Sequence, residues 1–187
     1  MRIIGGRARG LHLTPLGTGD AQAHLRPTSD RVRESIFNLL LNGGHGNLVQ
    51  GAKVLDLFAG TGALGLESLS RGAAQATFVE DGKVALGLIK RNIALMRATA
   101  ETEISRRDAT QLGANRGAPF DLVFLDPPYG KGLGEKAIAS AVAGGWLAPN
   151  AVIVWEESTQ PIPPAGLALL DQRKYGDTSV TLLRMPE

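Results

Sequence analysis

The residues best suited to chemistry stand together in one short stretch, Asp126-Pro127-Pro128-Tyr129. They follow the apolar run 120–125, which is typical of a buried strand in a parallel sheet. Neither proline can donate a hydrogen bond to a neighbouring strand, and each restricts the preceding residue to extended geometry. We therefore expect a stiff loop at a strand's carboxyl end, where open α/β sheets bind ligands. Its carboxylate, backbone carbonyls and aromatic ring could hold a planar amino group.

A second candidate stretch runs from Asp56 to Gly65 and begins at the end of another apolar strand. Its glycines, Gly60, Gly62 and Gly65, fit the pattern G-x-G-x-x-G between a strand and a helix. The pattern permits close approach of backbone to a ligand and, taken alone, suggests a dinucleotide site. An NAD-dependent enzyme is therefore one interpretation. Asp56 argues against it, because a carboxylate in the loop would repel a pyrophosphate and attract a cationic ligand. Nothing in 126–129 suits hydride transfer.

Two further acids are predicted to end strands of the same sheet. Glu80 could accept hydrogen bonds from both hydroxyls of a ribose, and Asp108 could contact an adenine amino group. With Asp56 and Asp126 they outline a pocket for a ribose, an adenine, an ammonium group and a reactive centre. S-adenosylmethionine has all four and carries no phosphate, so we predict it as the cofactor. The predicted cofactor-binding residues are Asp56, Phe58, Ala59, Gly60, Thr61, Gly62, Glu80, Asp81, Asp108 and Ala109.

The elements that position these residues alternate between strands and helices from residue 53 onward. Strands are predicted at 54–58, 76–80, 103–106, 121–125, 151–156, 167–174 and 179–185. Helices are predicted at 30–42, 63–71, 84–97 and 134–143, with a short helical turn near 109–112. The gap between the last two strands is too short for a crossover helix, so these strands should be antiparallel. The order predicts a three-layer α/β domain with one reversed strand.

The N-terminal part of the chain is basic and contains arginine but no lysine. Residues 1–33 hold six arginines and two aspartates, a net charge of +4, so the other residues sum to −2 in a chain of net +2. This imbalance suggests that the segment contacts a polyanion. Runs 2–4 and 11–14 could form a hairpin. In the helix 30–42, Arg31 and Arg33 are expected to lie off the apolar stripe. The residues predicted to contact this polyanion are Arg2, Arg7, Arg9, Arg26, Arg31 and Arg33.

Composition excludes several classes of protein. The 187 residues include no cysteine, which excludes disulfides, thiolate zinc sites and a cysteine nucleophile. No run approaches the roughly 20 apolar residues of a membrane span, and the N-terminus lacks the apolar core of a secretory signal. We expect a cytoplasmic monomer that needs neither a metal nor a membrane.

The motifs resemble those of class I S-adenosylmethionine-dependent methyltransferases that carry an Asp/Asn-Pro-Pro-Tyr/Phe motif and methylate exocyclic or amide nitrogens. Within that group the sequence is similar to the RsmD family of bacterial 16S rRNA guanine-N2 methyltransferases. The segment Arg-Pro-Thr-Ser-Asp-Arg-Val-Arg-Glu at 26–34 narrows the resemblance to this family. The resemblance spans essentially the whole chain, through the stretches 1–6, 26–38, 54–62 and 126–129.

The resemblance implies a Rossmann-like fold whose mostly parallel sheet has the strand order 3-2-1-4-5-7-6, with helices on both faces. It implies a basic N-terminal extension over 1–45 that contacts RNA and docks on a methyltransferase domain over 46–187. It also implies methylation of one guanine at N2 in 16S rRNA, on the assembled 30S subunit. The expected catalytic residues are Asp126, Pro127, Pro128 and Tyr129.

Other functions share these motifs. A DNA adenine-N6 methyltransferase usually needs a target-recognition region, for which 187 residues leave little room. A protein glutamine-N5 methyltransferase favours asparagine at the position of Asp126. A non-catalytic RNA-binding assembly factor on the same fold is a third alternative, and the intact motifs argue against it.

Overall fold

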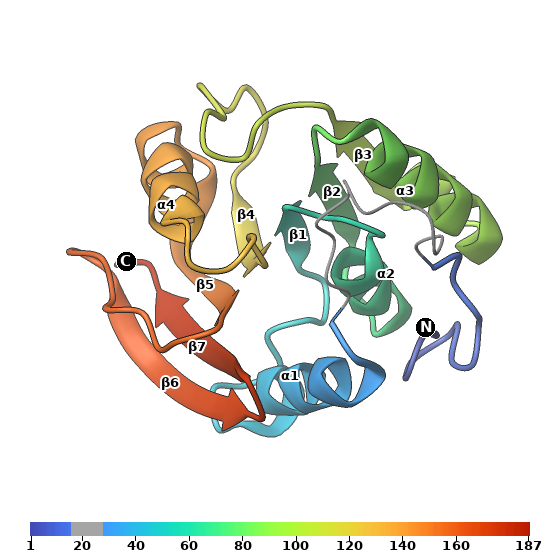
Figure 1. Cartoon of the computed structure of the whole chain (residues 1–187), viewed down its shortest axis with the longest axis horizontal. Helices are drawn as coiled ribbons and strands as arrows, with labels where there is room; N and C mark the ends of the chain where they lie inside the picture. The colour runs from blue at the N-terminus through green and yellow to red at the C-terminus, as the bar shows by residue number, and fades with distance from the viewer. Residues whose placement is uncertain (16–27) are drawn as a thin grey trace.

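The computed structural model describes residues 1–15 and 28–187 and shows a sheet with helices on both faces (Figure 1). The strands are β1 (Lys53–Leu57), β2 (Gln75–Val79), β3 (Thr102–Ser105), β4 (Phe120–Leu125), β5 (Leu147–Glu157), β6 (Ala168–Tyr175) and β7 (Thr178–Arg184). The helices are α1 (Asp30–Asn42), α2 (Ala63–Ser70), α3 (Lys83–Met96) and α4 (Leu133–Ala143), with a 3-10 turn η1 (Thr99–Glu101).

The seven strands form one sheet in the order β3-β2-β1-β4-β5-β7-β6, which confirms the predicted topology. Strands β1 to β5 pair in parallel, and β7 is antiparallel to both β5 and β6. Where a short helical turn is predicted near 109–112, the structure has a single hydrogen-bonded turn, in which Asp108 O accepts from Gln111 N at 3.0 Å, and no helix.

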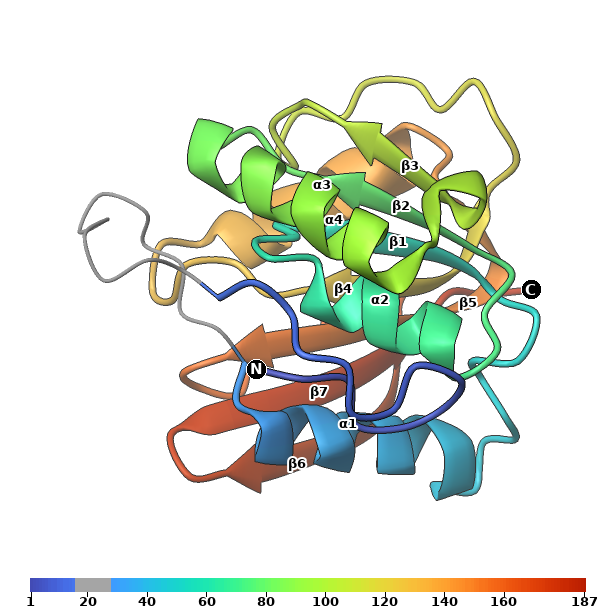
Figure 2. The ribbon, with the colours of Figure 1, turned by 90° about the vertical axis from the view of Figure 1, so that its right-hand side faces the viewer.

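Strand alternation divides the apolar core between the two faces of the sheet. One face packs against α1, α2 and α3, and the other packs against α4 (Figures 1 and 2). The residues Val54, Phe78, Phe124 and Val154 belong to the cluster on the first face. A residue two positions further along each strand therefore points to the same face of the sheet. This alternation decides on which face the acids at the strand ends lie.

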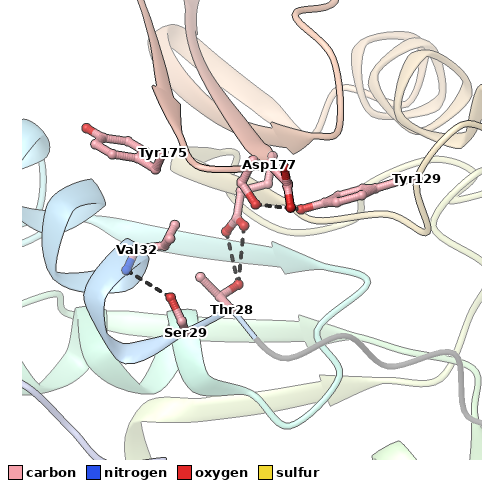
Figure 3. Close-up of a pocket in the computed structure, with 8 residues that line it drawn as sticks. Thr28, Ser29, Val32, Tyr129, Tyr175 and Asp177 are labelled. Carbon is pink, nitrogen blue, oxygen red and sulfur yellow. Dashed lines mark hydrogen bonds between the residues drawn. The ribbon is translucent and has the colours of Figure 1, made fainter.

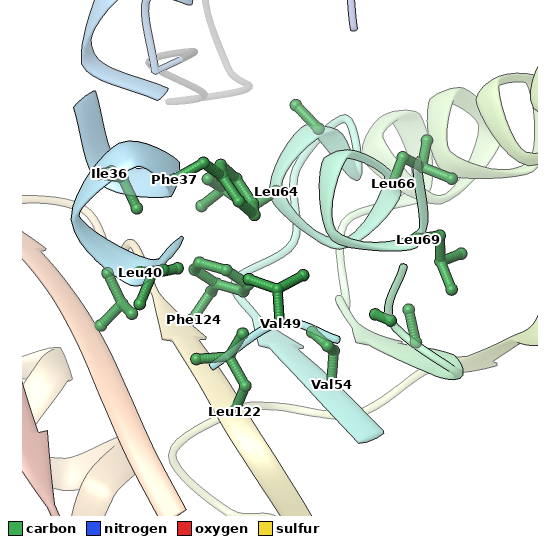
Figure 4. Packing of buried hydrophobic residues seen from close by; sticks show 14 of the residues in the cluster. Ile36, Phe37, Leu40, Val49, Val54, Leu64, Leu66, Leu69, Leu122 and Phe124 are labelled. Carbon is green, nitrogen blue, oxygen red and sulfur yellow. The ribbon is translucent and has the colours of Figure 1, made fainter. Parts of the chain in front are cut away.

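Helix α1 begins at an N-cap, Ser29, whose hydroxyl accepts a hydrogen bond from Val32 N at 3.2 Å. Its buried side packs on the sheet, and the rings of Phe37 and Phe124 lie 5.7 Å apart (Figure 4). Ile36 and Leu40 are fully buried in the same cluster. The helix therefore lies fixed against β4, and Thr28, two residues before it, lies near that strand's carboxyl end.

The N-terminal hairpin also packs on the first face of the sheet. Arg2 and His12 form an antiparallel bridge, and Ile3 and Leu13 are buried in the main cluster. Backbone N–H groups of Ile4 and Gly5 donate to the carboxylate of Glu67, a buried residue of α2, at distances from 2.9 to 3.2 Å. The hairpin is thus anchored by hydrogen bonds as well as by apolar packing.

The prediction that Arg33 lies off the apolar stripe and contacts RNA is wrong, because its side chain is fully buried. Its guanidinium pairs with Glu67, with 3.4 Å between Nε and Oε2, and donates to Asp30 Oδ1 at 2.9 Å and to the Arg2 carbonyl. Arg33 shares the helical spacing of Ile36, Phe37 and Leu40, so it lies on the core-facing stripe. Its role is to tie α1 to α2 and the hairpin.

Candidate active site

The carboxyl ends of the central strands bring several acids to one edge and one face of the sheet. Asp56 pairs with Phe124 in register between β1 and β4, and Asp126 comes two residues after Phe124. Glu80 likewise follows Phe78 by two residues on β2. Because side chains alternate along a strand, all three acids point to the face that α1 and α2 cover. The structure therefore brings together three of the four predicted strand-end acids.

The glycine loop closes over Asp56. The Asp56 carboxylate is 1% exposed and accepts a hydrogen bond from Gly65 N at 3.0 Å. A Cβ at Gly65 would lie 2.4 Å from the Phe78 ring, so a larger residue here could not pack as closely. Burial raises the pKa of the Asp56 carboxyl well above its ordinary value, and the charges of Asp126 and Glu80 add to the rise while the Gly65 hydrogen bond opposes it.

The backbone after β1 is held in an uncommon conformation. Phe58 has φ +55°, a left-handed value that costs a non-glycine residue about 1–2 kcal/mol. Two side chains hold the loop in place. Glu80 Oε2 accepts from Gly60 N at 2.9 Å, and Asn92 Nδ2 donates to the Thr61 carbonyl at 2.9 Å. Asn92 is buried in α3 and is a loop-supporting residue that the sequence analysis missed.

The remaining predicted cofactor residues lie toward the β3 edge. Glu80 Oε1 accepts from the N–H groups of Asp81 and Gly82 at 3.1 and 3.0 Å, which uses both of its lone pairs, whereas Oε2 accepts from Gly60 N and keeps a further lone pair for a hydroxyl. Asp108 follows β3, is exposed, and accepts from Thr110 N and Oγ1 at 2.8 and 2.7 Å. Because β3 lies two strands from β1, an extended ligand of roughly 10 Å would reach from Asp56 to Asp108.

The loop after β4 meets residues from both ends of the chain. The Thr28 hydroxyl lies 3.2 Å from Asp126 Oδ2 and 3.1 and 3.3 Å from the two carboxyl oxygens of Glu156 on β5. The Tyr129 hydroxyl lies 3.3 Å from Thr178 Oγ1. Thr28 and Glu156 were not among the predicted site residues. The signal that could have found Glu156 is its two-residue spacing from buried Val154, which places it on the face of Asp56 and Asp126.

A cavity of about 210 Å³ opens beside this loop (Figure 3). Two aromatic residues from different elements contribute to its wall, Tyr129 of the loop and Tyr175 at the end of β6. Burial raises the pKa of the Tyr175 hydroxyl above its ordinary value. The lining residues are Thr28, Ser29, Val32, Tyr129, Glu156, Tyr175, Asp177 and Thr178. The cavity has the rings and polar groups that a flat heterocycle needs.

The predicted RNA-binding arginines fall into different places. Arg2 and Arg31 are exposed and lie near the start of α1, where Arg2 Nε is 3.8 Å from Asp30 Oδ2. Arg7 pairs with Glu101, which precedes β3 and so lies at the opposite, amino edge of the sheet. Arg9 is exposed in the same hairpin as Arg7. The remaining predicted contact, Arg26, lies outside the described residues.

Two kinds of feature do not occur within residues 1–15 and 28–187. The helices of these two ranges include none with the length and apolarity needed to cross a membrane. The same residues contain no group of three or more histidines and acids placed to hold a metal ion.

Comparison with known proteins agrees with this architecture. A solved structure of yhhF from Escherichia coli superposes with a TM-score of 0.82 and 37% identity, and covers 100% of this chain and 98% of its own. A Thermus thermophilus structure, TTHA0928, gives a TM-score of 0.74 at 28% identity, with coverage of 100% and 99%. The strand order and the strand-end site define a class I methyltransferase.

The particular family follows from the sequence comparisons. A family model described as Conserved hypothetical protein 95 matches residues 1–184. A relative named ribosomal RNA small subunit methyltransferase D, from Escherichia coli K12, is 41% identical and covers 97% of this chain and 88% of its own length. The protein of the same name from Haemophilus influenzae is 37% identical, with coverage of 97% and 92%. The chain belongs to this family, the RsmD family.

Proposed function

We propose that this protein transfers a methyl group from S-adenosylmethionine to N2 of one guanine in 16S rRNA, on the assembled 30S subunit in the cytoplasm. The relatives' names support ribosomal RNA of the small subunit as the substrate class. The observation that carries the proposal is the meeting of the Asp126-Pro127-Pro128-Tyr129 loop with the acid-lined glycine loop at one sheet edge. The resemblance to RsmD enzymes supplies the choice of guanine N2.

The strand-end residues fit this cofactor. Asp56, Asp126 and Glu80 place negative charge around the glycine loop, which favours a cation and disfavours a phosphate. The chemistry that S-adenosylmethionine supplies when bound is an activated methyl group on a positively charged sulfur. Glu80 would hold the ribose, Asp108 and Ala109 the adenine, and Asp56 the ammonium group by way of the loop. The backbone of 58–62 and the neighbouring Asp81 would complete the contact.

The loop after β4 would prepare the acceptor amine. The guanine N2 lone pair is delocalised into the ring, so the amine is a weak nucleophile. Asp126 and the Pro127 carbonyl would accept hydrogen bonds from the two N–H groups of this amine. These contacts would localise the lone pair on N2 and direct it at the methyl group. Tyr129 would stack on the base, and Pro128 would keep the loop stiff. Much of the rate would then come from in-line placement of the reacting atoms, after the base has left its stack.

The RNA contact would use the exposed arginines of the N-terminal extension. Of the predicted set, Arg2 and Arg31 are best placed because both lie beside the start of α1, next to the cavity. Arg9, Arg26 and Arg7 remain proposed contacts, although Arg7 would have to leave Glu101 to bind a phosphate. Residues 1–45 would in this way serve as the RNA-contacting extension of the 46–187 domain, in a monomer.

The experiment that tests the proposal is a methyl-transfer assay on small subunits that lack the modification, with the product nucleoside identified by mass spectrometry. Wild type should yield N2-methylguanosine. Asp126→Ala should lower turnover by about 100-fold or more, because positioning of the nucleophile is lost, and leave cofactor affinity within a few-fold. A matched control is Asp121→Asn, at the other end of β4, where the carboxylate accepts from Lys53 N at 2.8 Å.

Several results would overturn the proposal. Methylated adenine or glutamine as the product would point to the alternative substrates. Cofactor binding without any transfer would point to an RNA-binding assembly factor. Loss of cofactor affinity in Asp126→Ala with turnover retained would refute the role given to that carboxylate.

A further inference from the structure

Glu156 is a buried carboxyl at the wall of the cavity, one strand away from Asp126. The residue is 2% exposed, although it lies near the end of β5. Burial raises the pKa of its carboxyl well above the ordinary value, and the charge of Asp126 adds to the rise. The hydrogen bond from Thr28 and the charge of Arg33 oppose it. A carboxyl in such a place is costly to bury, which marks it as a candidate for function rather than for packing.

The carboxyls of Glu156 and Asp126 both approach the Thr28 hydroxyl, which can donate its hydrogen to only one of them at a time. The hydroxyl lies within 3.3 Å of one oxygen of Asp126 and of both oxygens of Glu156. Two acceptors so close together match a base edge that presents two adjacent N–H donors. The Watson–Crick edge of guanine has this pattern, with N1–H beside the N2 amino group. Adenine and cytosine have an acceptor nitrogen in the ring beside their amino group, which would face a carboxylate oxygen unfavourably.

We propose that Glu156 selects guanine by accepting a hydrogen bond from its N1–H while Asp126 accepts from the N2 amino group. This inference rests on the proposed function, since it assigns a recognition contact to the same acceptor site. Tyr129, Tyr175 and Glu156 all line the cavity, so a ring lying there would be within reach of the Glu156 carboxyl. The Asp126 carboxyl lies beyond Thr28, whose side chain also lines the cavity (Figure 3). Selection then follows from hydrogen-bond donors that only the correct base carries.

The test compares two acceptors at the target position of otherwise identical small subunits, guanine and 2-aminopurine. The analogue keeps the 2-amino group but has no hydrogen on N1. In Glu156→Ala, kcat/KM for guanine should fall by about 10- to 100-fold, because N1–H is left without an acceptor. For 2-aminopurine, kcat/KM should change by less than about 3-fold. The preference of the enzyme for guanine over 2-aminopurine should therefore largely disappear. Glu156→Gln keeps the side-chain volume and one acceptor oxygen, and should lose less activity on guanine than Glu156→Ala.

A matched variant separates recognition from a merely structural role. Thr28→Val removes the hydroxyl that Glu156 binds and leaves the carboxyl in place. If Glu156 served only to hold Thr28, both variants would lower activity on guanine and 2-aminopurine by equal factors, and the proposal would be overturned. Unchanged activity of Glu156→Ala on guanine would overturn it as well. Failure of wild type to methylate guanine at N2 would instead refute the proposed function. Cofactor titration shows that each variant is folded.

Discussion

At the scale of single residues, strand alternation decides which acids share the site. Asp126 and Glu156 each come two residues after a member of the same apolar cluster, Phe124 and Val154, and both point toward the Thr28 hydroxyl. Each carboxyl loses solvent and faces another negative group. Burial and like charge therefore act against folding at neutral pH, and both favour a cationic cofactor and an N–H donor in their place.

Glu156→Gln should make the free protein more stable at neutral pH. The pKa of Glu156 is raised in the folded state, so the native protein binds more protons than the unfolded chain above the ordinary value of 4.5. The free energy of unfolding of wild type consequently falls as pH rises from about 4.5 toward the raised pKa. The amide has no such penalty and can still accept from Thr28. We expect Tm at pH 7.5 to rise by roughly 2–8 °C.

The pH series carries its own control. Near pH 4 the carboxyl is protonated in both the folded and the unfolded state, so the difference in Tm between Glu156→Gln and wild type should shrink toward zero. A difference that stays constant from pH 4 to pH 8 would mean that the substitution acts through packing and not through the carboxyl's charge.

At the scale of elements, the alternation of strands and helices predicted a three-layer α/β sheet with one reversed strand, and the resemblance to the methyltransferase family supplied the strand order. The gap of four residues between the predicted strands 167–174 and 179–185, which is two residues between β6 and β7, required an antiparallel pair, and buried strands such as β4 are largely apolar runs. Residues of the site could be predicted only where an acidic side chain stands at the end of an apolar strand, as at Asp56 and Asp126. Thr28 could not, because Thr28, Ser29 and Asp30 all suit an N-cap. Only the packed structure shows that Ser29 caps α1 and Thr28 turns to the acids.

Arg33 shows a different limit of sequence reasoning. Its charge suggested solvent or RNA, yet its position relative to Ile36 and Phe37 gives it the core-facing side of α1. Burial is tolerated because Glu67 and Asp30 supply opposite charge and the Arg2 carbonyl an acceptor. Periodicity would have placed Arg33 correctly once Phe37 was included in the apolar stripe.

The Arg33–Glu67 pair should hold α1 and the hairpin to the domain. Arg33→Met leaves the buried Glu67 carboxylate with less compensating charge, so the free energy of unfolding should fall by about 3 kcal/mol. Urea denaturation of the variant and of wild type measures this difference in the free energy of unfolding. The matched control is Arg31→Met on the same helix, which is exposed and should change stability by less than about 0.5 kcal/mol. Equal effects of the two substitutions would show that the buried pair does not stabilise this junction.

At the scale of the whole molecule, the carboxyl ends and the amino ends of the parallel strands have different roles. The carboxyl ends of the parallel strands carry the acids and the cavity, and Arg2 and Arg31 lie beside them. The amino ends carry other exposed arginines, such as Arg97 after α3 and Arg116 before β4. An RNA that delivers a base to the cavity should therefore contact arginines, and release counterions, only at the carboxyl ends of the parallel strands. Net charge alone would make the two pairs equivalent.

Salt dependence of RNA binding distinguishes these two ends of the strands. Arg2→Gln with Arg31→Gln should weaken binding to small subunits and reduce the slope of log K against log salt by about 1 for each phosphate that the protein no longer neutralises. Arg97→Gln with Arg116→Gln changes the net charge equally and should leave the slope within error of wild type. Equal reductions in both double variants would mean that binding responds to total charge. An unchanged slope in the first pair would remove Arg2 and Arg31 from the interface and shift the RNA-binding role to other residues of the extension.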